Sequence, residues 1–158
     1  MSTTPTVHAS AVLLGARAVL IRGPSGAGKS RLALALIAAA DAGALPFARL
    51  VADDRCRLAP AHGRLLVRPA AELAGLIEVR GLGIRRLPFE PAAVVGLVVD
   101  LAAADAERLP AETSGRVLIE DVAIARLAVA SGVDPLPLVL ARRMGNYPAE
   151  RAEVRFGR

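Results

Sequence analysis

The chain has 158 residues, about the length of one ordinary domain, and 54% of them are hydrophobic, which allows a buried core and excludes a disordered tail or a small disulfide-stabilised fold. The net charge is +5, but the 19 arginines are scattered and only four residues are aromatic, which argues against nucleic-acid binding. The single cysteine, Cys56, can form no disulfide within the chain, as is usual for a cytoplasmic protein. No apolar run reaches the roughly 18 residues of a membrane-spanning helix. We therefore expect one soluble, cytoplasmic domain over residues 1–158 with no membrane partner.

The order of the predicted elements is that of a layered α/β domain. In chain order these are strands at 7–14 and 18–21, a helix at 30–40 that Gly43 ends, a strand at 49–53, a hairpin at 56–58 and 64–67, a strand at 94–101, and, after residue 107, short strands with a weak helix near 137–143. A mixed β-sheet fits this order better than a purely parallel one. We therefore expect an α/β fold built around a strand–loop–helix unit.

The loop of that unit carries the strongest motif of the sequence. Residues 23–30 match G-x-x-x-x-G-K-[ST] without a mismatch and consist of Gly23, Pro24, Ser25, Gly26, Ala27, Gly28, Lys29 and Ser30. The glycines allow positive φ and close backbone approach, so that N–H groups can point at phosphate oxygens. Lys29, the only lysine of the chain, can reach the β- and γ-phosphates, and the Ser30 hydroxyl is placed for Mg²⁺. The motif predicts that the chain binds a nucleotide or another polyphosphate.

Three acidic residues and a histidine are candidates for the remaining chemistry. A phosphate-loop kinase needs a carboxylate for Mg²⁺ and a base for the acceptor hydroxyl, and Asp53 and Asp54 end a predicted strand. Adjacent residues of a strand point to opposite faces, so only one of them faces the phosphates unless the strand has already ended. Glu78 lies just before a glycine-flanked segment, which could approach a ligand closely. His8 lies in the predicted strand at 7–14, before the strand that leads into the loop at 23–30. A single histidine at a strand position is more often structural than catalytic.

Together, Val7–His8, the loop at 23–30, Leu50–Arg55 and Ile77–Ile84 resemble the catalytic domain of HPr kinase/phosphorylase, in the same order along the chain. Residues 78–84, EVRGLGI, resemble that family's own E-[IV]-R-G-L-G-I signature. The resemblance implies a short form of the family that consists of the C-terminal catalytic domain. It also implies an enzyme that transfers phosphoryl from ATP to a serine of HPr, the phosphocarrier protein of a phosphotransferase system, and that reverses the reaction by phosphorolysis.

The resemblance further implies roles for single residues. Carried over by position, Lys29 would bind phosphate, and Ser30 and Glu78 would bind Mg²⁺. Asp54 would transfer the proton with support from Asp53, and His8 would lie beside the transferred phosphate. A carboxylate between Mg²⁺ and a serine hydroxyl is what general-base phosphoryl transfer requires. The family also implies a homo-oligomer, a hexamer.

Two other functions stay open at this point. A small-molecule kinase or NTPase would need an arginine-rich lid or an acceptor pocket, and Arg142–Arg143 is a candidate for such a lid. A nonenzymatic nucleotide-sensing module is the other alternative, because the family's late G-R-N segment reads Gly132-Val133-Asp134 here and lacks its arginine. A transition-state arginine is worth about 10³ or more in rate.

Overall fold

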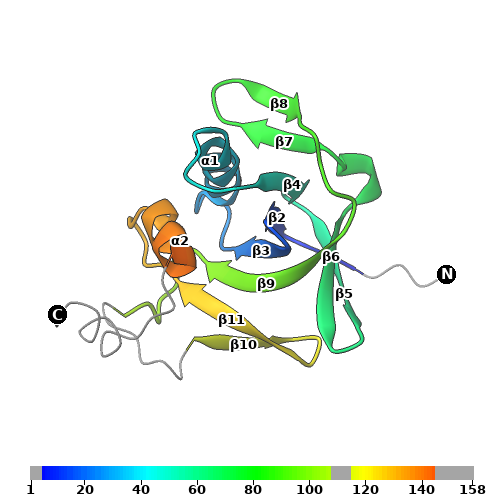
Figure 1. Cartoon of the computed structure of the whole chain (residues 1–158), viewed down its shortest axis with the longest axis vertical. Helices are drawn as coiled ribbons and strands as arrows, with labels where there is room; N and C mark the ends of the chain where they lie inside the picture. The colour runs from blue at the N-terminus through cyan, green and yellow to red at the C-terminus, as the bar shows by residue number, and fades with distance from the viewer. Residues whose placement is uncertain (1–4, 108–114, 145–158) are drawn as a thin grey trace, which may run out of the picture.

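A curled, mixed β-sheet forms the centre of the structure, which is a computed structural model that describes residues 5–107 and 115–144 (Figure 1). The strands are β1 (Thr6–Val7), β2 (Ala9–Leu14), β3 (Arg17–Arg22), β4 (Ala48–Ala52), β5 (Cys56–Ala61), β6 (Arg64–Pro69), β7 (Leu76–Val79), β8 (Gly83–Arg86), β9 (Ala93–Asp100), β10 (Arg116–Ile119) and β11 (Val122–Ala128). The helical segments are α1 (Lys29–Asp41), the 3₁₀ turn η1 (Ala71–Leu73) and α2 (Pro135–Met144). Neither α-helix of the described part is long and apolar enough to cross a membrane.

The main sheet has the order β1-β5-β6-β9-β3-β2-β4, and β11 pairs with both β9 and β10. β9 runs parallel to β3 and to β11 but antiparallel to β6, so the sheet is mixed, as the sequence predicts. Because β9 pairs with β6 near its start and with β11 near its end, the sheet divides there and curls.

The alternation of apolar residues in the central strands fills two cores, one on each side of the sheet. Val19 and Ile21 of β3 pack with α1 and α2 on one side. Ala18 and Leu20 pack on the other side, which hairpin β5–β6 covers. Strands covered on both faces read as continuous apolar runs, which explains why the segments around β3 and β9 are recognisable from the sequence.

Most predicted elements are confirmed to within a few residues, and one strand is corrected. The predicted strand at 7–14 is broken at His8, because β1 pairs with β5 whereas β2 pairs with β3 and β4. His8 therefore lies in the gap between two strands and not within one strand. The chain changes its pairing partner at this residue, which leaves the His8 side chain exposed at the end of the sheet.

Helix α1 begins and ends at the residues that the sequence marks. Gly28, in the left-handed conformation at φ 101°, immediately precedes it, and Gly43, at φ 85°, follows its last turn and donates its N–H to the carbonyl of Ala40. Helix α2 begins at Pro135, and the Asp134 carboxylate accepts the N–H of Leu136 at 3.1 Å as an N-terminal cap.

Hairpin β7–β8 forms a separate two-stranded sheet and was not predicted as strands. All four residues of β8 are exposed, so no alternation of apolar and polar residues marks it in the sequence. The base of the hairpin is held by the segment that follows it. The Leu87 N–H donates to the carbonyl of Gly75 at 2.8 Å, and the Glu90 N–H donates to the carbonyl of Leu50 in β4, also at 2.8 Å.

Candidate functional site

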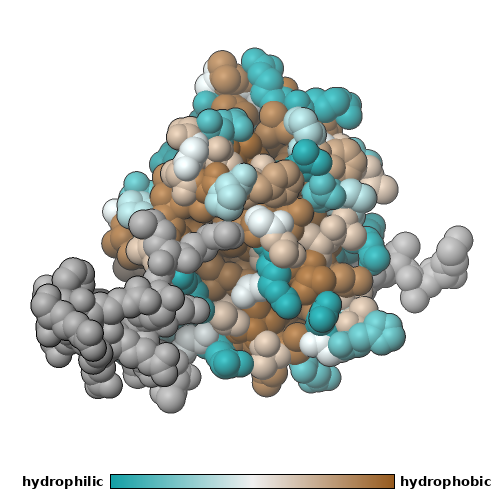
Figure 2. Space-filling model, in the orientation of Figure 1, coloured by the Kyte–Doolittle hydropathy of each residue, from teal (hydrophilic) through white to brown (hydrophobic). Residues whose placement is uncertain are grey.

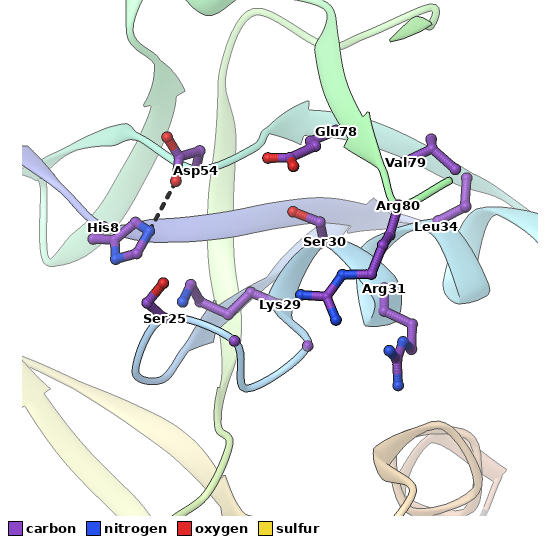
Figure 3. Close-up of a pocket in the computed structure, with 12 residues that line it drawn as sticks. His8, Ser25, Lys29, Ser30, Arg31, Leu34, Asp54, Glu78, Val79 and Arg80 are labelled. Carbon is purple, nitrogen blue, oxygen red and sulfur yellow. Dashed lines mark hydrogen bonds and ion pairs between the residues drawn. The ribbon is translucent and has the colours of Figure 1, made fainter. Parts of the chain in front are cut away.

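A pocket of about 470 Å³ lies where β3, β4 and β7 end (Figure 3). Besides Ser25, Gly26 and Gly28 of the predicted loop, its wall brings together five residues predicted to be functional, namely His8, Lys29, Ser30, Asp54 and Glu78. These residues come from the gap between β1 and β2, from the start of α1, from the turn after β4 and from β7. The hairpin that the sequence did not reveal therefore forms one side of the candidate site.

The glycines of the predicted phosphate loop, residues 23–30, differ in their surroundings. Gly26 and Gly28 have φ of 83° and 101°, and a Cβ atom on either would meet nothing within 4 Å. Their positive φ calls for glycine, and no neighbouring protein atom limits the space beside them. At Gly23, in contrast, an added Cβ would lie 3.1 Å from the Leu101 Cβ and 3.3 Å from the Ala27 Cβ. Gly23 thus also permits close packing behind the loop.

The eight loop residues divide accordingly into a front and a back. The residues on the pocket wall are Ser25, Gly26, Gly28, Lys29 and Ser30, whereas Gly23, Pro24 and Ala27 are not part of it. The Ala27 N–H donates to the Pro24 carbonyl at 3.0 Å and closes a turn at the back of the loop. Helix α1 has no side-chain cap at its N-terminus, so its first backbone N–H groups are free to receive an anion.

Lys29 is nearly buried, with 7% of its surface exposed, although it is charged. Its ammonium donates to the carbonyls of Gly23 at 2.8 Å and Pro24 at 3.1 Å. These neutral acceptors hold the ammonium beside the loop without neutralising its charge, so the charge remains available to a phosphate.

Asp53 lies beneath the pocket and joins three elements. Its side chain is buried, and its Oδ1 accepts hydrogen bonds from the hydroxyls of Ser10 and Ser30, both at 2.7 Å. Its Oδ2 accepts the backbone N–H of Glu78 at 3.1 Å. Ser10 was not singled out from the sequence, although it is the one polar residue in the apolar run of β2. Asp53 therefore contacts both residues that were predicted to bind Mg²⁺, Ser30 through its hydroxyl and Glu78 through its backbone.

Asp54 faces the pocket because the strand has ended before it. β4 stops at Ala52, and Asp54 adopts φ 68° in a tight turn in which the Arg55 N–H donates to the Asp53 carbonyl at 2.8 Å. The exposed carboxylate of Asp54 accepts a hydrogen bond from Nε2 of His8 at 2.8 Å. Since a carboxylate only accepts, this contact places the proton on Nε2.

Glu78 and Arg80 approach the pocket from the other side. Glu78 lies on the pocket wall, as predicted, and Figure 3 shows its carboxylate on the same side of the pocket as Asp54. Arg80 reaches from the end of β7 toward the first turn of α1, where Arg31 also lines the pocket. The two arginines were not predicted as site residues, although Arg80 belongs to the glycine-flanked segment after Glu78.

The donor set suits Mg²⁺ more than a transition metal. The described residues contain no group of three or more His, Cys, Asp or Glu side chains that could hold a metal ion by themselves. Mg²⁺ characteristically binds through one or two carboxylates, phosphate oxygens and waters. The Ser30 hydroxyl and the Glu78 carboxylate on the pocket wall, with Asp53 behind Ser30, supply oxygen ligands of this kind.

The residues behind the two alternative functions lie elsewhere. Gly132 and Val133 are exposed in the connection between β11 and α2, and neither is on the pocket wall. Arg142 is exposed on α2 and does not line the pocket, while the side chain of Arg143 lies outside the described residues. The candidate arginine lid is therefore not found at the pocket among the described residues.

Comparison of the sequence with known proteins identifies the family of this chain. Residues 1–129 match the family model of the HPr Serine kinase C-terminal domain. The HPr kinase/phosphorylase of Geobacillus thermodenitrificans is 35% identical over 141 residues, which are 82% of this chain and 43% of that protein. The HPr kinase/phosphorylase of Geobacillus kaustophilus is 38% identical over 116 residues, which are 68% of this chain and 35% of that protein. The chain spans less than half the length of these curated relatives.

A solved structure supports the fold. The HPr(Ser) kinase/phosphatase from Coxiella burnetii superimposes with a TM-score of 0.71 at 21% identity, and the alignment covers 98% of this chain and 100% of that one. The α/β fold with a curled mixed sheet is thereby confirmed.

Proposed function

Since the chain belongs to the HPr serine kinase C-terminal domain family, we propose that it is an ATP-dependent kinase that phosphorylates a serine of an HPr-like phosphocarrier protein. The observation that carries this proposal is the placement of Lys29, Ser30, Asp54 and Glu78 on the wall of one pocket. A phosphoryl-transfer site needs a phosphate cradle, oxygen ligands for Mg²⁺ and a base, and these residues supply all three.

On the phosphate side, the loop and the N-terminus of α1 offer backbone N–H groups to the triphosphate, and the Lys29 ammonium lies beside them. Ser30 and Glu78 would hold Mg²⁺, which neutralises charge on the β- and γ-phosphate oxygens when bound. Arg31 and Arg80 add positive charge to the same pocket.

On the acceptor side, Asp54 takes the proton of the serine hydroxyl of HPr. At the same time the serine oxygen bonds to the γ-phosphorus of ATP, and the bond from that phosphorus to the leaving ADP breaks. The His8 N–H donates to Asp54 at 2.8 Å and holds the carboxylate in place. In the reverse direction, an oxygen of inorganic phosphate bonds to the phosphorus of phosphoserine and pyrophosphate forms as the bond to the serine oxygen breaks. Asp54 takes the proton of the attacking phosphate and passes it to that serine oxygen.

A protein acceptor fits the rim of the pocket better than a small molecule does. Leu82 and Ile84, at the tip of hairpin β7–β8, are 63% and 60% exposed, beside the exposed Arg85 and Arg86. Figure 2 shows hydrophobic and hydrophilic residues side by side at the end of the molecule formed by β7 and β8. Exposed apolar residues rimmed by charge are typical of protein-binding surfaces.

Incubation of the purified chain with Mg²⁺, ATP and HPr from the same cell tests the proposal. Phosphoserine on HPr is the expected product, detected by intact-mass spectrometry with an HPr variant that lacks the acceptor serine as control. ATP turnover without phospho-HPr would favour the small-molecule kinase or NTPase. Nucleotide binding without turnover would favour the sensing module.

The same proposal includes the location and the oligomeric state of the enzyme. We propose that it is cytoplasmic and that it forms a homo-oligomer, the hexamer implied by the family resemblance. Sedimentation velocity of the purified chain measures the oligomeric state directly.

A further inference from the structure

A carboxylate with no part in the proposed chemistry stands beside the phosphate loop. Asp100 ends β9, directly opposite Arg22 in the parallel pairing of β9 with β3, and Arg22 immediately precedes Gly23. An acid at the end of a strand next to the phosphate-loop strand has two possible uses. It can serve a metal ion at the phosphates, or it can fix the strand from which the loop begins.

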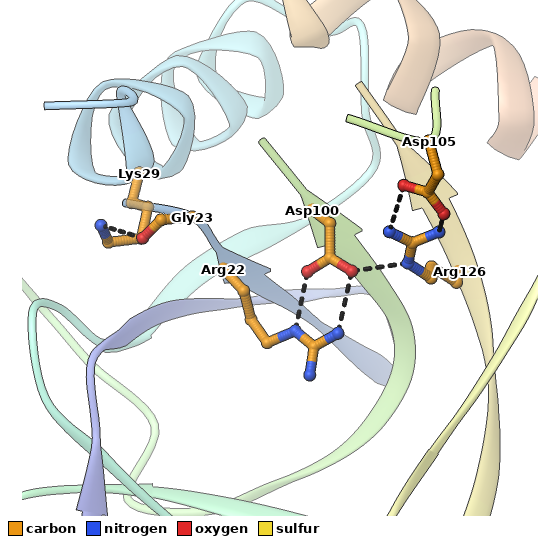
Figure 4. Close-up of polar contacts among 6 residues, drawn as sticks. All are labelled: Arg22, Gly23, Lys29, Asp100, Asp105 and Arg126. Atoms are coloured by element: carbon orange, nitrogen blue, oxygen red, sulfur yellow. Dashed lines mark hydrogen bonds and ion pairs between the residues drawn. The ribbon is translucent and has the colours of Figure 1, made fainter. Parts of the chain in front are cut away.

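The contacts of Asp100 favour the second use (Figure 4). Arg22 donates to both of its oxygens, from Nε to Oδ1 at 2.7 Å and from Nη2 to Oδ2 at 2.8 Å. Arg126 of β11 donates to Oδ2 from Nε at 2.6 Å, and its Nη1 and Nη2 bind Asp105 at 2.7 and 3.0 Å. Both oxygens of Asp100 are therefore engaged by guanidinium groups, and its side chain is only 14% exposed.

The electrostatics agree with this arrangement. Burial alone raises the pKa of Asp100, but the hydrogen bonds and charges of Arg22 and Arg126 outweigh it and bring the pKa below its usual value. The hydrogen bonds that Arg126 donates to Asp105 and Asp100 raise the pKa of Arg126 above its usual value. Asp100 is thus ionised but already neutralised by two cations, and it does not line the pocket. A carboxylate in this state is a poor ligand for a further cation.

The cluster connects directly to the phosphate loop. The N–H of Leu101, the residue after Asp100, donates to the Arg22 carbonyl at 2.8 Å. Gly23 packs so closely on Leu101 that an added Cβ would lie 3.1 Å from the Leu101 Cβ and 3.2 Å from its carbonyl oxygen. The Gly23 carbonyl in turn accepts the Lys29 ammonium at 2.8 Å. A displacement of Arg22 would therefore move both the first loop residue and an acceptor of the phosphate-binding lysine.

We infer that Asp100, held by Arg22 and Arg126, is a positioning residue that fixes the start of the phosphate loop, and that it is not a ligand of the Mg²⁺ ion. This inference rests on the proposed binding of a triphosphate. Its particular consequence is that loss of the Asp100 charge weakens nucleotide binding to the same degree with and without Mg²⁺. Loss of a metal ligand weakens binding only when Mg²⁺ is present.

The test is isothermal titration of ATP into the full chain, in excess Mg²⁺ and separately in EDTA, with no acceptor protein. We expect Asp100→Asn to raise the Kd about tenfold in both buffers, the size of one charge-assisted hydrogen bond. Glu78→Gln should raise the Kd in Mg²⁺ alone. Glu90→Gln removes the separate Arg49–Glu90 pair at 2.9 Å and serves as the matched control, with an unchanged Kd.

Two further measurements separate positioning from general stability. Arg22→Lys keeps the charge but loses the two-pronged contact, so it should shift the Kd in the same direction by a smaller factor, and it provides the test if Asp100→Asn does not fold. Titrations are made well below each variant's Tm, where a purely structural role would lower Tm and leave the Kd unchanged. An unchanged Kd in both variants would overturn the inference, as would a loss confined to Mg²⁺. If the parent chain itself binds no ATP in either buffer, the proposed function fails along with it.

Discussion

The Ser30 hydroxyl donates a hydrogen bond of 2.7 Å to Oδ1 of Asp53, so the phosphate loop and the end of β4 are joined inside the protein. The next residue, Asp54, faces the pocket and accepts a hydrogen bond from His8. Two adjacent acids thus occupy different environments, one buried and fully hydrogen-bonded, the other exposed and open to an acceptor. The first two predictions follow from this difference.

Asp54→Asn should retain ATP binding and lose phosphoryl transfer by roughly 10²-fold or more, because the amide keeps the shape of the side chain but cannot take up the serine proton. The rate of phospho-HPr formation and the Kd for ATP are the two measurements. Transfer at the parental rate would eliminate Asp54 as the base.

Asp53→Asn should act differently, through structure and metal binding. The new NH₂ group would face either the Glu78 N–H or the two serine hydroxyls, where the parent offers only acceptors. With the amide oxygen toward the Glu78 N–H, the serine hydroxyls can turn and accept from the NH₂ group, but they then lose Asp53 as their acceptor. A buried polar group that loses its partner costs about 1–3 kcal/mol, so the free energy of unfolding in urea should fall by about that amount. Equal loss of transfer in Asp53→Asn and Asp54→Asn, without loss of stability, would mean that the base is not identified.

Lys29→Ala should weaken ATP binding by about 10²-fold, since the chain has no second lysine and loses its charge-assisted hydrogen bonds to phosphate. Lys29→Arg is the control for charge alone, and it should restore binding only in part because a planar guanidinium replaces a compact ammonium. Tight ATP binding by the alanine variant would contradict the phosphate-loop assignment.

Glu78→Gln should raise the Mg²⁺ concentration needed for half-maximal transfer, because a neutral amide is a poorer ligand for a hard cation. Folding should change little, since the Glu78 side chain is exposed and its backbone N–H, which binds Asp53, is unaltered. A Mg²⁺ titration of activity is the measurement. An unchanged midpoint would remove Glu78 from the metal site.

The exposed hairpin tip should matter for the protein acceptor alone. Ile84→Ser, which removes a 60% exposed apolar side chain, should raise the KM for HPr and leave the KM for ATP unchanged. Leu118→Ser changes a 70% exposed residue of β10 and is the matched control. An equal effect of both variants on the KM for HPr would show that the hairpin is not where the acceptor binds.

Acid should weaken the Asp100 cluster in a defined pH range. The pKa of Asp100 is lowered in the folded protein, so its contribution to stability is complete above the unfolded value of about 3.9 and is lost as the pH falls through the folded value. The free energy of unfolding of the parent should therefore fall more steeply below about pH 4 than that of Asp100→Asn. Urea unfolding at a series of pH values measures the two slopes, and identical slopes would contradict the shift.

The sequence alone determined the class of the fold and the kind of chemistry. Local features sufficed, because Gly26, Gly28, Lys29 and Ser30 are consecutive or nearly so. The helix that begins at Lys29 lies between Gly28 and Gly43, which mark its two ends in the sequence. The apolar runs of β3 and β9 were recognisable because both of their faces are buried. The family was likewise identifiable from motifs whose order is linear along the chain.

Only the tertiary structure decided how separate segments meet. Asp53 and Asp54 are neighbours in sequence, yet the left-handed turn at Asp54 and the contacts of Ser10 and Ser30 with Asp53 separate their environments. Hairpin β7–β8 is closed by the backbone hydrogen bond between Leu87 and Gly75 and is joined to β4 by the bond from Glu90 to Leu50, and its fully exposed strand β8 carries no periodic pattern. The pairing of Arg22 with Asp100 spans 78 residues and depends on the register of two parallel strands, and register is a property of the assembled sheet.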